Sequence, residues 1–264
     1  RAATRELSFE QNLGQHDPRV NFVVRSAGYT GFLSGGDLHL RLEPAGAGAR
    51  PSGLVMELPG TADARARGER PLVSRSHYLR GADPEHWIRD VPHYAAVRYT
   101  AVYPGIDLVY RSAGGALEYD FQVAPGADPG RIVLTFRGAE SLTAAGDDGS
   151  LVIETASGTI RQRPPVAFQR RPDGGVDSVD AAFTLADGRV GFTLGAWDRE
   201  RELIIDPPLT FSTFLGGSLA DHGKDVAVDA NGNAYVVGWT KSEFFPVTLG
   251  AYQETKSGGA DQGN

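Results

Sequence analysis

Hydrophobic and polar residues alternate along most of this chain, and the alternation has a period of two. It is strict over 37–42, where Leu38, Leu40 and Leu42 are separated by polar residues. A period of two places the apolar side chains on one face of an extended strand. The segments that we predict as strands on this basis are 20–24, 37–42, 131–136, 151–153, 190–194 and 203–205.

No segment carries the sustained apolar stripe of a helix. The sequence predicts a single helical turn at 83–87, with Asp83 as its cap and Pro84 at its first position. Gly-rich turns separate the strands, at 34–36, 114–115, 147–149, 173–175 and 187–188. Many short strands joined by such turns predict an all-β fold with a large antiparallel β-sandwich-like domain.

Two stretches interrupt the strand pattern. Residues 45–70 are rich in Ala, Gly, Pro and Arg, and we expect a loop there with one apolar island at 54–58. Pro207 and Pro208 cannot donate to a sheet ladder, so they predict a boundary. The predicted organisation is a sandwich-like domain over 1–205, a Pro-rich linker over 206–210 and a second unit over 211–264.

The second unit differs from the first in its sequence pattern. Two alternating segments, 225–229 and 234–240, flank Asn231-Gly232, which is the strongest short-range signal for a β-hairpin. Together with the segments that follow, this makes a unit of about forty residues, which suits one blade of a β-propeller.

Composition narrows the classes of protein. The 264 residues contain no cysteine, which excludes a disulfide scaffold and cysteine-ligated zinc. No stretch approaches the roughly 20 apolar residues of a membrane helix, so we expect no membrane insertion. The net charge of −7 argues against nucleic acid and anionic membranes as partners.

The second unit resembles a known repeat. Its segments 212–218, 229–238 and 250–253 are similar to the SBBP-type β-propeller repeat of bacterial surface and secreted proteins. The first 205 residues resemble the uncharacterised β-rich domain that often precedes such repeats. The motifs that carry this second resemblance lie at 10–15, 91–94, 102–110, 117–121, 125–129 and 203–207.

The resemblance implies a bacterial protein that is secreted or held at the cell surface, and it implies no known reaction or catalytic residue. A propeller needs several blades, whereas this chain carries one repeat unit, so we expect an incomplete propeller. Unpaired strand edges in such a unit favour association, and a homo-oligomer through these edges is one expectation.

The segment 106–122 holds the best candidate site, because Asp107, Glu118 and Asp120 share one face of a predicted hairpin. A four-residue loop would set Asp107 opposite Asp120, and these like charges would need a cation, a shared proton or an arginine. A two-residue loop would instead set Arg111 opposite Glu118 as an ordinary ion pair. Paired carboxylates build both glycosidase and calcium sites, so three interpretations remain: structural ion pairs, a calcium site and a carbohydrate-active site.

Three aromatic residues form a second candidate site. Trp87 lies between Tyr78 and Tyr94 in the sequence, and exposed rings of this kind could stack on a sugar ring. A buried Trp87 that only fills the core is the alternative. Ligand binding at Trp87, Tyr78 and Tyr94 is therefore an expectation that depends on their exposure.

Two further groups contain metal-ligating residue types. His77, His86 and His93 are seven or more residues apart and match no zinc motif, which favours scattered surface histidines. Segment 229–233 has oxygen-bearing side chains at alternate positions, as in the first half of a calcium loop, but it lacks the later glutamate. A tight Asn-Gly turn explains this segment without a metal.

We therefore expect an extracellular structural or adhesive module that binds a protein or a polysaccharide at the cell surface, with no catalysis and no resident cofactor. The chain has neither a Gly-rich phosphate loop nor a G-x-S-x-G elbow. The alternatives are a carbohydrate-binding or carbohydrate-active protein that uses Asp107, Glu118 and Asp120, and a scaffold stabilised by calcium on that same face.

Overall fold

The computed structural model of the chain describes residues 6–26, 28–42, 52–61, 64–144, 148–207, 209–211, 221–228 and 234–241. In these ranges the regular structure is β throughout, apart from two single turns of 3₁₀-helix, η1 (Pro84–His86) and η2 (Pro129–Arg131). Asp83 caps η1 by accepting a hydrogen bond from the Glu85 N–H, with Pro84 in the first turn. The all-β prediction and the helical turn at 83–87 are both confirmed.

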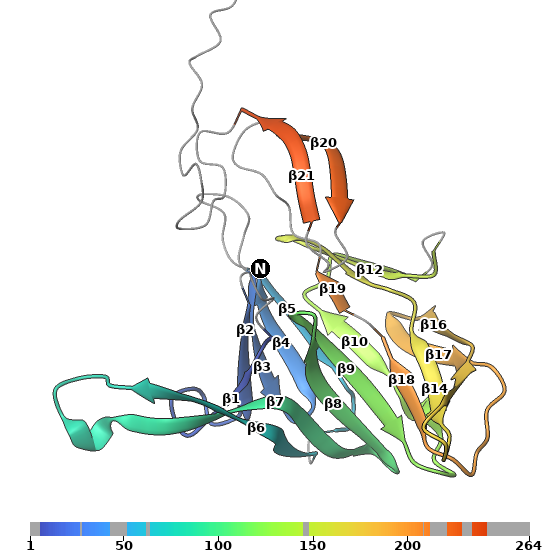
Figure 1. The fold of residues 1–264 in the computed structure, drawn as a ribbon, viewed down its shortest axis with the longest axis horizontal. Coiled ribbons are helices and arrows are strands. Elements are labelled where there is room, and N and C mark those ends of the chain that lie inside the picture. Colours follow the sequence, from blue (N-terminus) through green and yellow to red (C-terminus); the bar gives the residue numbers. More distant parts are fainter. Residues whose placement is uncertain are drawn as a thin grey trace, which may run out of the picture.

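Fifteen strands form one antiparallel sheet that curves strongly (Figure 1). Its strands, in spatial order, are β15 (Val176–Val179), β14 (Val166–Arg170), β18 (Leu203–Asp206), β9 (Ala116–Val123), β8 (Ile106–Ala113), β7 (Ile88–Tyr103), β1 (Phe9–Gln11), β2 (Phe22–Ser26), β3 (Tyr29–Ser34), β4 (Asp37–Leu42), β5 (Ser52–Glu57), β10 (Leu134–Arg137), β17 (Arg189–Leu194) and β16 (Ala181–Ala186), and β6 (Arg65–Tyr78) pairs with β7.

Strand β7 divides this sheet into two wings. Its later residues pair with β8, and the first wing continues from β8 through β9, β18 and β14 to β15. Its earlier residues pair with β1, in the register Phe9↔Tyr94, and the second wing continues from β1 to β16. The chain passes from β15 to β16 through Asp180 alone, so the two ends of the strand order are consecutive in sequence and the sheet nearly closes.

The two wings face each other across one core. Tyr110 of the first wing donates from Oη to the carbonyl oxygen of Gly36 at 2.7 Å, in the turn that joins β3 and β4. The rings of Phe121 and Phe192 meet from opposite wings, with their centroids 6.0 Å apart. This face-to-face packing is the sandwich-like arrangement that the alternating pattern predicts.

The hairpin β8–β9 supplies the centre of the core. The side chains predicted to share its inner face are all fully buried, and they are Ile106, Leu108, Tyr110, Leu117, Tyr119 and Phe121. Tyr119 donates from Oη to Gln162 at 3.0 Å, so its buried hydroxyl is satisfied. The period-two pattern therefore identified this inner face correctly.

A second sheet of four strands consists of β11 (Ser141–Ala144), β12 (Leu151–Thr155), β13 (Gly158–Gln162) and β19 (Leu209–Phe211). Strand β18 ends at Asp206 and β19 begins at Leu209, so strand residues flank the two prolines of the predicted linker. The domain boundary itself stays a prediction. The hairpin expected in the second unit is confirmed as β20 (Asp221–Val228) and β21 (Ala234–Thr240), and its turn, 229–233, lies outside the described residues.

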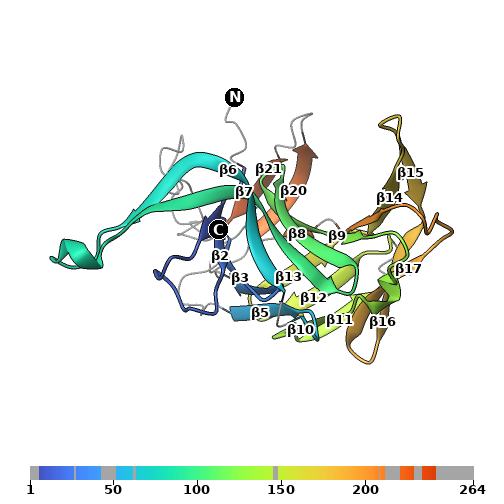
Figure 2. The ribbon, with the colours of Figure 1, turned by 90° about the horizontal axis from the view of Figure 1, so that it is seen from below.

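The prediction of a loop over 45–70 is wrong in part. The apolar island lies in β5, and β6 begins at Arg65. In β6, arginines occupy the outer positions and the small residues Ala66 and Gly68 the inner ones, so no hydrophobic alternation marks the strand. The later residues of β6 and the earlier residues of β7 extend away from the large sheet as a two-stranded ribbon with η1 at its tip (Figures 1 and 2). We call residues 72–90 the arm.

Candidate binding groove

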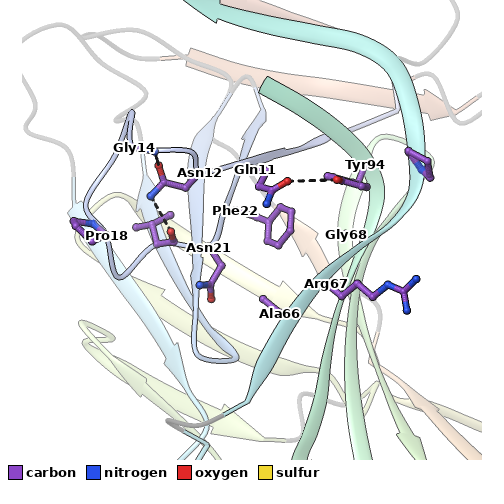
Figure 3. A pocket seen from close by; sticks show the side chains of 12 residues that line it. Gln11, Asn12, Gly14, Pro18, Asn21, Phe22, Ala66, Arg67, Gly68 and Tyr94 are labelled. Carbon is purple, nitrogen blue, oxygen red and sulfur yellow. Dashed lines mark hydrogen bonds between the residues drawn. The ribbon is translucent and has the colours of Figure 1, made fainter. Parts of the chain in front are cut away.

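A groove of about 770 Å³ lies at the base of the arm, between β6, β7 and the loop that joins β1 to β2 (Figure 3). The loop wall is held in place by Asn12. Its amide nitrogen donates to the carbonyl oxygens of Asp17 (2.9 Å) and Val20 (2.8 Å). Its amide oxygen accepts from the backbone N–H groups of Gly14 and His16, both at 3.1 Å. This wall is therefore shaped by the chain itself before any ligand binds.

Tyr94 forms the opposite part of the groove. Its ring lies against the backbone of Gly68, where a Cβ atom would be 2.5 Å from the ring carbons. The ring of Phe22 meets it edge to face at 5.8 Å, and its Oη donates to Gln11 at 3.4 Å. The absence of a side chain at Gly68 therefore allows the Tyr94 ring to lie in this position.

Two amide groups of the groove have free donors. Gln11 accepts from Tyr94, and Asn21 accepts from Tyr99 (3.0 Å) and from the Gly35 N–H (3.2 Å). Within the described ranges, neither amide nitrogen donates a hydrogen bond to the protein. Both can therefore donate to a ligand that offers hydroxyl or carbonyl oxygens.

Arg67 lies at the rim of the groove, opposite Arg98 on β7. Arg98 is engaged by carboxylates on both sides, since it donates to Glu69 at 2.6 Å and to Asp107 at 3.1 Å. Arg67 is exposed and has no carboxylate within ion-pair distance in the described part of the chain. The rim therefore carries a positive charge that the described protein does not neutralise.

A smaller cavity of about 320 Å³ lies on the other face of β1. It is built around Glu10, which is only 3% exposed and accepts hydrogen bonds from Tyr78 and from Gln15 (3.2 Å). Burial opposes ionisation of Glu10, but these hydrogen bonds and the Arg25 guanidinium outweigh it, so the pKa of Glu10 lies below its usual value. Glu10 is therefore a buried, ionised carboxylate whose partners come from three separate elements.

His93 connects this cavity to β6. Its Nδ1 lies 3.0 Å from the Ser8 hydroxyl and its Nε2 lies 2.7 Å from the Ser76 hydroxyl. Burial lowers the pKa of His93, which favours a neutral imidazole. Both ring nitrogens are engaged, so the ring of His93 on β7 joins Ser76 of β6 to Ser8, the residue before β1, in one polar network.

The carboxylates of the hairpin 106–122 follow the two-residue loop. Arg111 pairs with Glu118, while Asp107 lies opposite Gln122 and Asp120 opposite Val109. The alternative that sets Asp107 opposite Asp120 is therefore wrong. Both central glycines of the turn have positive φ, Gly114 at 57° and Gly115 at 78°, which is what a two-residue hairpin turn requires.

Arginines separate the three carboxylates into two clusters. Arg111 binds Glu118 at 2.5 Å, Asp120 at 2.7 Å and Asp206 at 2.7 Å, whereas Asp107 binds Arg98. In the described ranges, no group of three or more histidine, aspartate or glutamate side chains is arranged to hold a metal ion. The structure thus brings Glu118 and Asp120 together but places Asp107 elsewhere.

Asp206 is the unusual member of the Arg111 cluster. Burial and the nearby Asp120 charge raise the pKa of Asp206 to about 7, although Arg111 acts in the opposite direction. Its Oδ1 is buried without a hydrogen-bond partner in the described structure. A single guanidinium therefore faces three carboxylates at the end of β18.

The three aromatic residues of the second candidate site do not form one platform. Tyr94 lies in the groove, Tyr78 reaches Glu10, and Trp87 at the tip of the arm donates from Nε1 to Gly81 at 3.1 Å. No ring contact joins these three among the described residues. The histidines are likewise dispersed, because His77 accepts from the Asp90 N–H and His86 contacts Asp83.

Of the residues that line the groove, the sequence marks Tyr94 as a candidate but does not mark Gln11, Asn21, Phe22, Arg67 or Gly68. One signal was available: the motif stretches 10–15 and 91–94 both carry the resemblance. The structure pairs them directly, with Glu10 opposite His93. Segments that are far apart in the sequence therefore build this one site.

Two parts of the chain match known protein families. Residues 9–208 match the family described as "Domain of unknown function (DUF7948)". The chain belongs to this family. Residues 210–245 match the β-propeller repeat SBBP. The resemblance is thus confirmed for both parts, while bacterial origin and secretion stay predictions.

Other comparisons add little. No curated protein and no solved structure matches the chain. No helix in the described ranges has the length and apolar character needed to cross a membrane.

Proposed function

We propose that this chain is a non-catalytic binding module that holds a segment of a glycan chain in the groove at the base of the arm. The observation that carries the proposal is the groove itself, which the Asn12 loop and the Tyr94–Gly68 packing shape in advance. Its volume of about 770 Å³ falls in the range of roughly 300–1,000 Å³ that is typical of ligand pockets.

The lining supports a glycan as the ligand. An aromatic ring offers an apolar surface to the C–H groups of a sugar, and Tyr94, supported by the buried ring of Phe22, supplies such a surface. The free amide donors of Gln11 and Asn21 suit a chain rich in hydroxyl oxygens. We further propose that the module works outside the cell or at its surface, a setting that the adjoining propeller repeat supports.

Co-sedimentation with a panel of insoluble polysaccharides tests the proposal, with reducing ends assayed in the same tubes. We expect retention on at least one polysaccharide without release of sugar. Gln11→Ala should weaken retention by several-fold, because it removes one donor from the groove. Gln122→Ala is the matched control, since Gln122 also accepts one side-chain hydrogen bond, from Arg98, but lies outside the groove.

Three results would overturn this function. If no polysaccharide retained the chain, a glycan ligand would be ruled out. If Gln11→Ala and Gln122→Ala lost retention equally, the groove would be ruled out as the binding site. Release of reducing ends by the purified chain would show catalysis.

Self-association through the arm is a second candidate function. Val73 is 98% exposed and Leu79 is 56% exposed, although both are large apolar residues. An isolated two-stranded ribbon is marginally stable in water, so packing against a second copy would stabilise it. Light scattering should then give a mass above 28.1 kDa that falls in a Val73→Glu variant, and a strict monomer at high concentration would refute the idea.

A further inference from the structure

A row of arginines follows β6 alongside the groove. The row consists of Arg65, Arg67, Arg70 and Arg75, all of them exposed. In the described part of the chain, none of them has a carboxylate within ion-pair distance. The one acidic residue of the strand, Glu69, is committed to Arg98 at 2.6 Å.

This row contrasts with the arginines of the protein that are held in ion pairs. Seven described arginines hold a carboxylate within 3.3 Å, and they are Arg19, Arg98, Arg111, Arg137, Arg161, Arg171 and Arg201. The chain as a whole is acidic, with a net charge of −7. Positive charge concentrated on one strand of an acidic protein is therefore a local feature that favours an anionic ligand there.

The row is continuous with the groove. Arg67 and Pro71 line it, and Arg65 lies two residues from Arg67 on the same side of the strand. Two residues of an extended strand span about 6.6 Å, so these two guanidinium groups can meet successive charges of an extended polymer. Across the sheet, Arg98 cannot compensate Arg67, because its charge has the same sign and its carboxylate partners are already engaged.

The backbone of β6 disfavours a peptide as this polymer. Arg70 has a positive φ of 53°, and the pairing of β6 with β7 shifts register between Pro71 and Arg75. Pro71 also lacks the N–H that an added strand would need. A polysaccharide needs no main-chain ladder, and its charged groups can be bound by side chains alone.

We propose that the ligand of the groove is an acidic polysaccharide whose carboxylates are bound by Arg65 and Arg67, with Arg70 and Arg75 extending the positive surface. This inference rests on the proposed function and specifies its ligand. The guanidinium fork matches a carboxylate in two parallel hydrogen bonds, which a neutral sugar cannot provide. Binding of this kind weakens as salt screens the charges.

A matched pair of ligands tests the proposal on the full chain. Polygalacturonate and its fully methyl-esterified form share one backbone and differ in the charge of the carboxyl group. We expect the chain to bind polygalacturonate at least tenfold more tightly and to lose most of this preference at high salt. The double variant R65Q/R67Q should lose roughly tenfold in affinity for polygalacturonate, since exposed ion pairs contribute up to about 1 kcal/mol each.

The control variant R131Q/R189Q removes the same charge elsewhere. Arg131 and Arg189 are exposed arginines that have no ion pair among the described residues, and neither lines the groove. Its affinity for polygalacturonate should stay within twofold of the wild type. An equal loss in both double variants would overturn the assignment to β6.

The remaining outcomes separate this inference from the proposed function. If polygalacturonate and its methyl-esterified form bound equally well, the preference for an acidic ligand would be refuted, while glycan binding would still stand. Tighter binding of poly-glutamate than of polygalacturonate would overturn the polysaccharide and indicate an acidic peptide. If the chain bound none of a panel of neutral and acidic polysaccharides, both proposals would be refuted.

Discussion

The ring of Tyr94 occupies the space that a side chain at position 68 would fill. A Cβ atom at Gly68 would lie 2.5–2.6 Å from three ring carbons, far inside van der Waals contact. The two residues lie on neighbouring strands, 26 positions apart, and their contact sets the shape of the groove.

Replacing Gly68 with alanine should destabilise the protein and displace Tyr94. Overpacking of this kind costs about 1–3 kcal/mol, and the displaced ring should also weaken glycan binding. Thermal unfolding measures the first effect and co-sedimentation the second. Gly53→Ala is the control, because a Cβ there meets its nearest atom at 3.9 Å. Equal melting temperatures for the two variants would contradict the packing described here.

Tyr78→Phe should lower stability near neutral pH by about 1–3 kcal/mol, because it leaves buried Glu10 without its phenol donor. The folded-state pKa of Glu10 is below its usual value of 4.5. Its ionisation therefore contributes stability that is present above pH 4.5 and is lost as the pH falls through the folded-state pKa. Removing the phenol should raise that pKa, so the difference between variant and wild type should shrink in acid.

Thermal unfolding at several pH values between 3 and 7 checks this prediction. Tyr103→Phe serves as the control, since Tyr103 also donates from Oη, to the Val133 carbonyl at 3.0 Å, but does not contact a carboxylate. Its effect should not depend on the ionisation of Glu10. A pH-independent loss in Tyr78→Phe would show that the carboxylate is not the partner that matters.

The inner face of the β8–β9 hairpin was predictable because strand periodicity alone determines which side chains share a face. Its register was not, because both an apolar alternation and a pair of glycines are compatible with two loop lengths. Positive φ at Gly114 and Gly115 resolves the choice in favour of the two-residue loop. Arg111 then meets Glu118, and the calcium hypothesis loses Asp107 from its ligand set.

The groove could not be predicted from local pattern. Strand β6 has arginines on its outer face and small residues on its inner face, so it resembles a loop in the sequence. Only its register with β7 places Gly68 beneath Tyr94. The pairing of β7 with β1 is likewise a tertiary event, and it brings the loop between β1 and β2 beside β6 and β7, where the groove forms.

Calcium should leave the stability of the described domain unchanged. The carboxylates of the predicted site already bind guanidinium groups, at 2.5 Å for Glu118 and 3.1 Å for Asp107. A bound calcium ion would have to displace an arginine, so the contacts it gains would be offset by the ion pairs that are lost. We expect equal melting temperatures in EDTA and in excess calcium, and a higher value in calcium would restore the scaffold hypothesis.

Asp206 should make the stability of the protein fall as the pH rises towards 8. Its pKa is raised from 3.8 to about 7 in the folded state, so the folded chain holds a proton that the unfolded chain releases earlier. The stabilising proton is fully bound in both states below pH 3.8, and its contribution is lost between pH 4 and pH 7. Asp120 and Asp206 share the Arg111 guanidinium, so this loss of stability belongs to the cluster of carboxylates and not to Asp206 alone.

Asp206→Asn should therefore raise the melting temperature more at pH 8 than at pH 5, because the proton's contribution is only partly lost at pH 5. An asparagine keeps an oxygen that accepts from Arg111, as the Asp206 carboxylate does at 2.7 Å, but it removes one of the three negative charges. Glu202→Gln is the charge-matched control, because Glu202 is exposed and should respond weakly at both pH values. A gain in Asp206→Asn that is the same at pH 5 and pH 8 would show that ionisation of this carboxylate does not limit stability. A loss at pH 8 would show that its negative charge is needed to hold Arg111 at the end of β18.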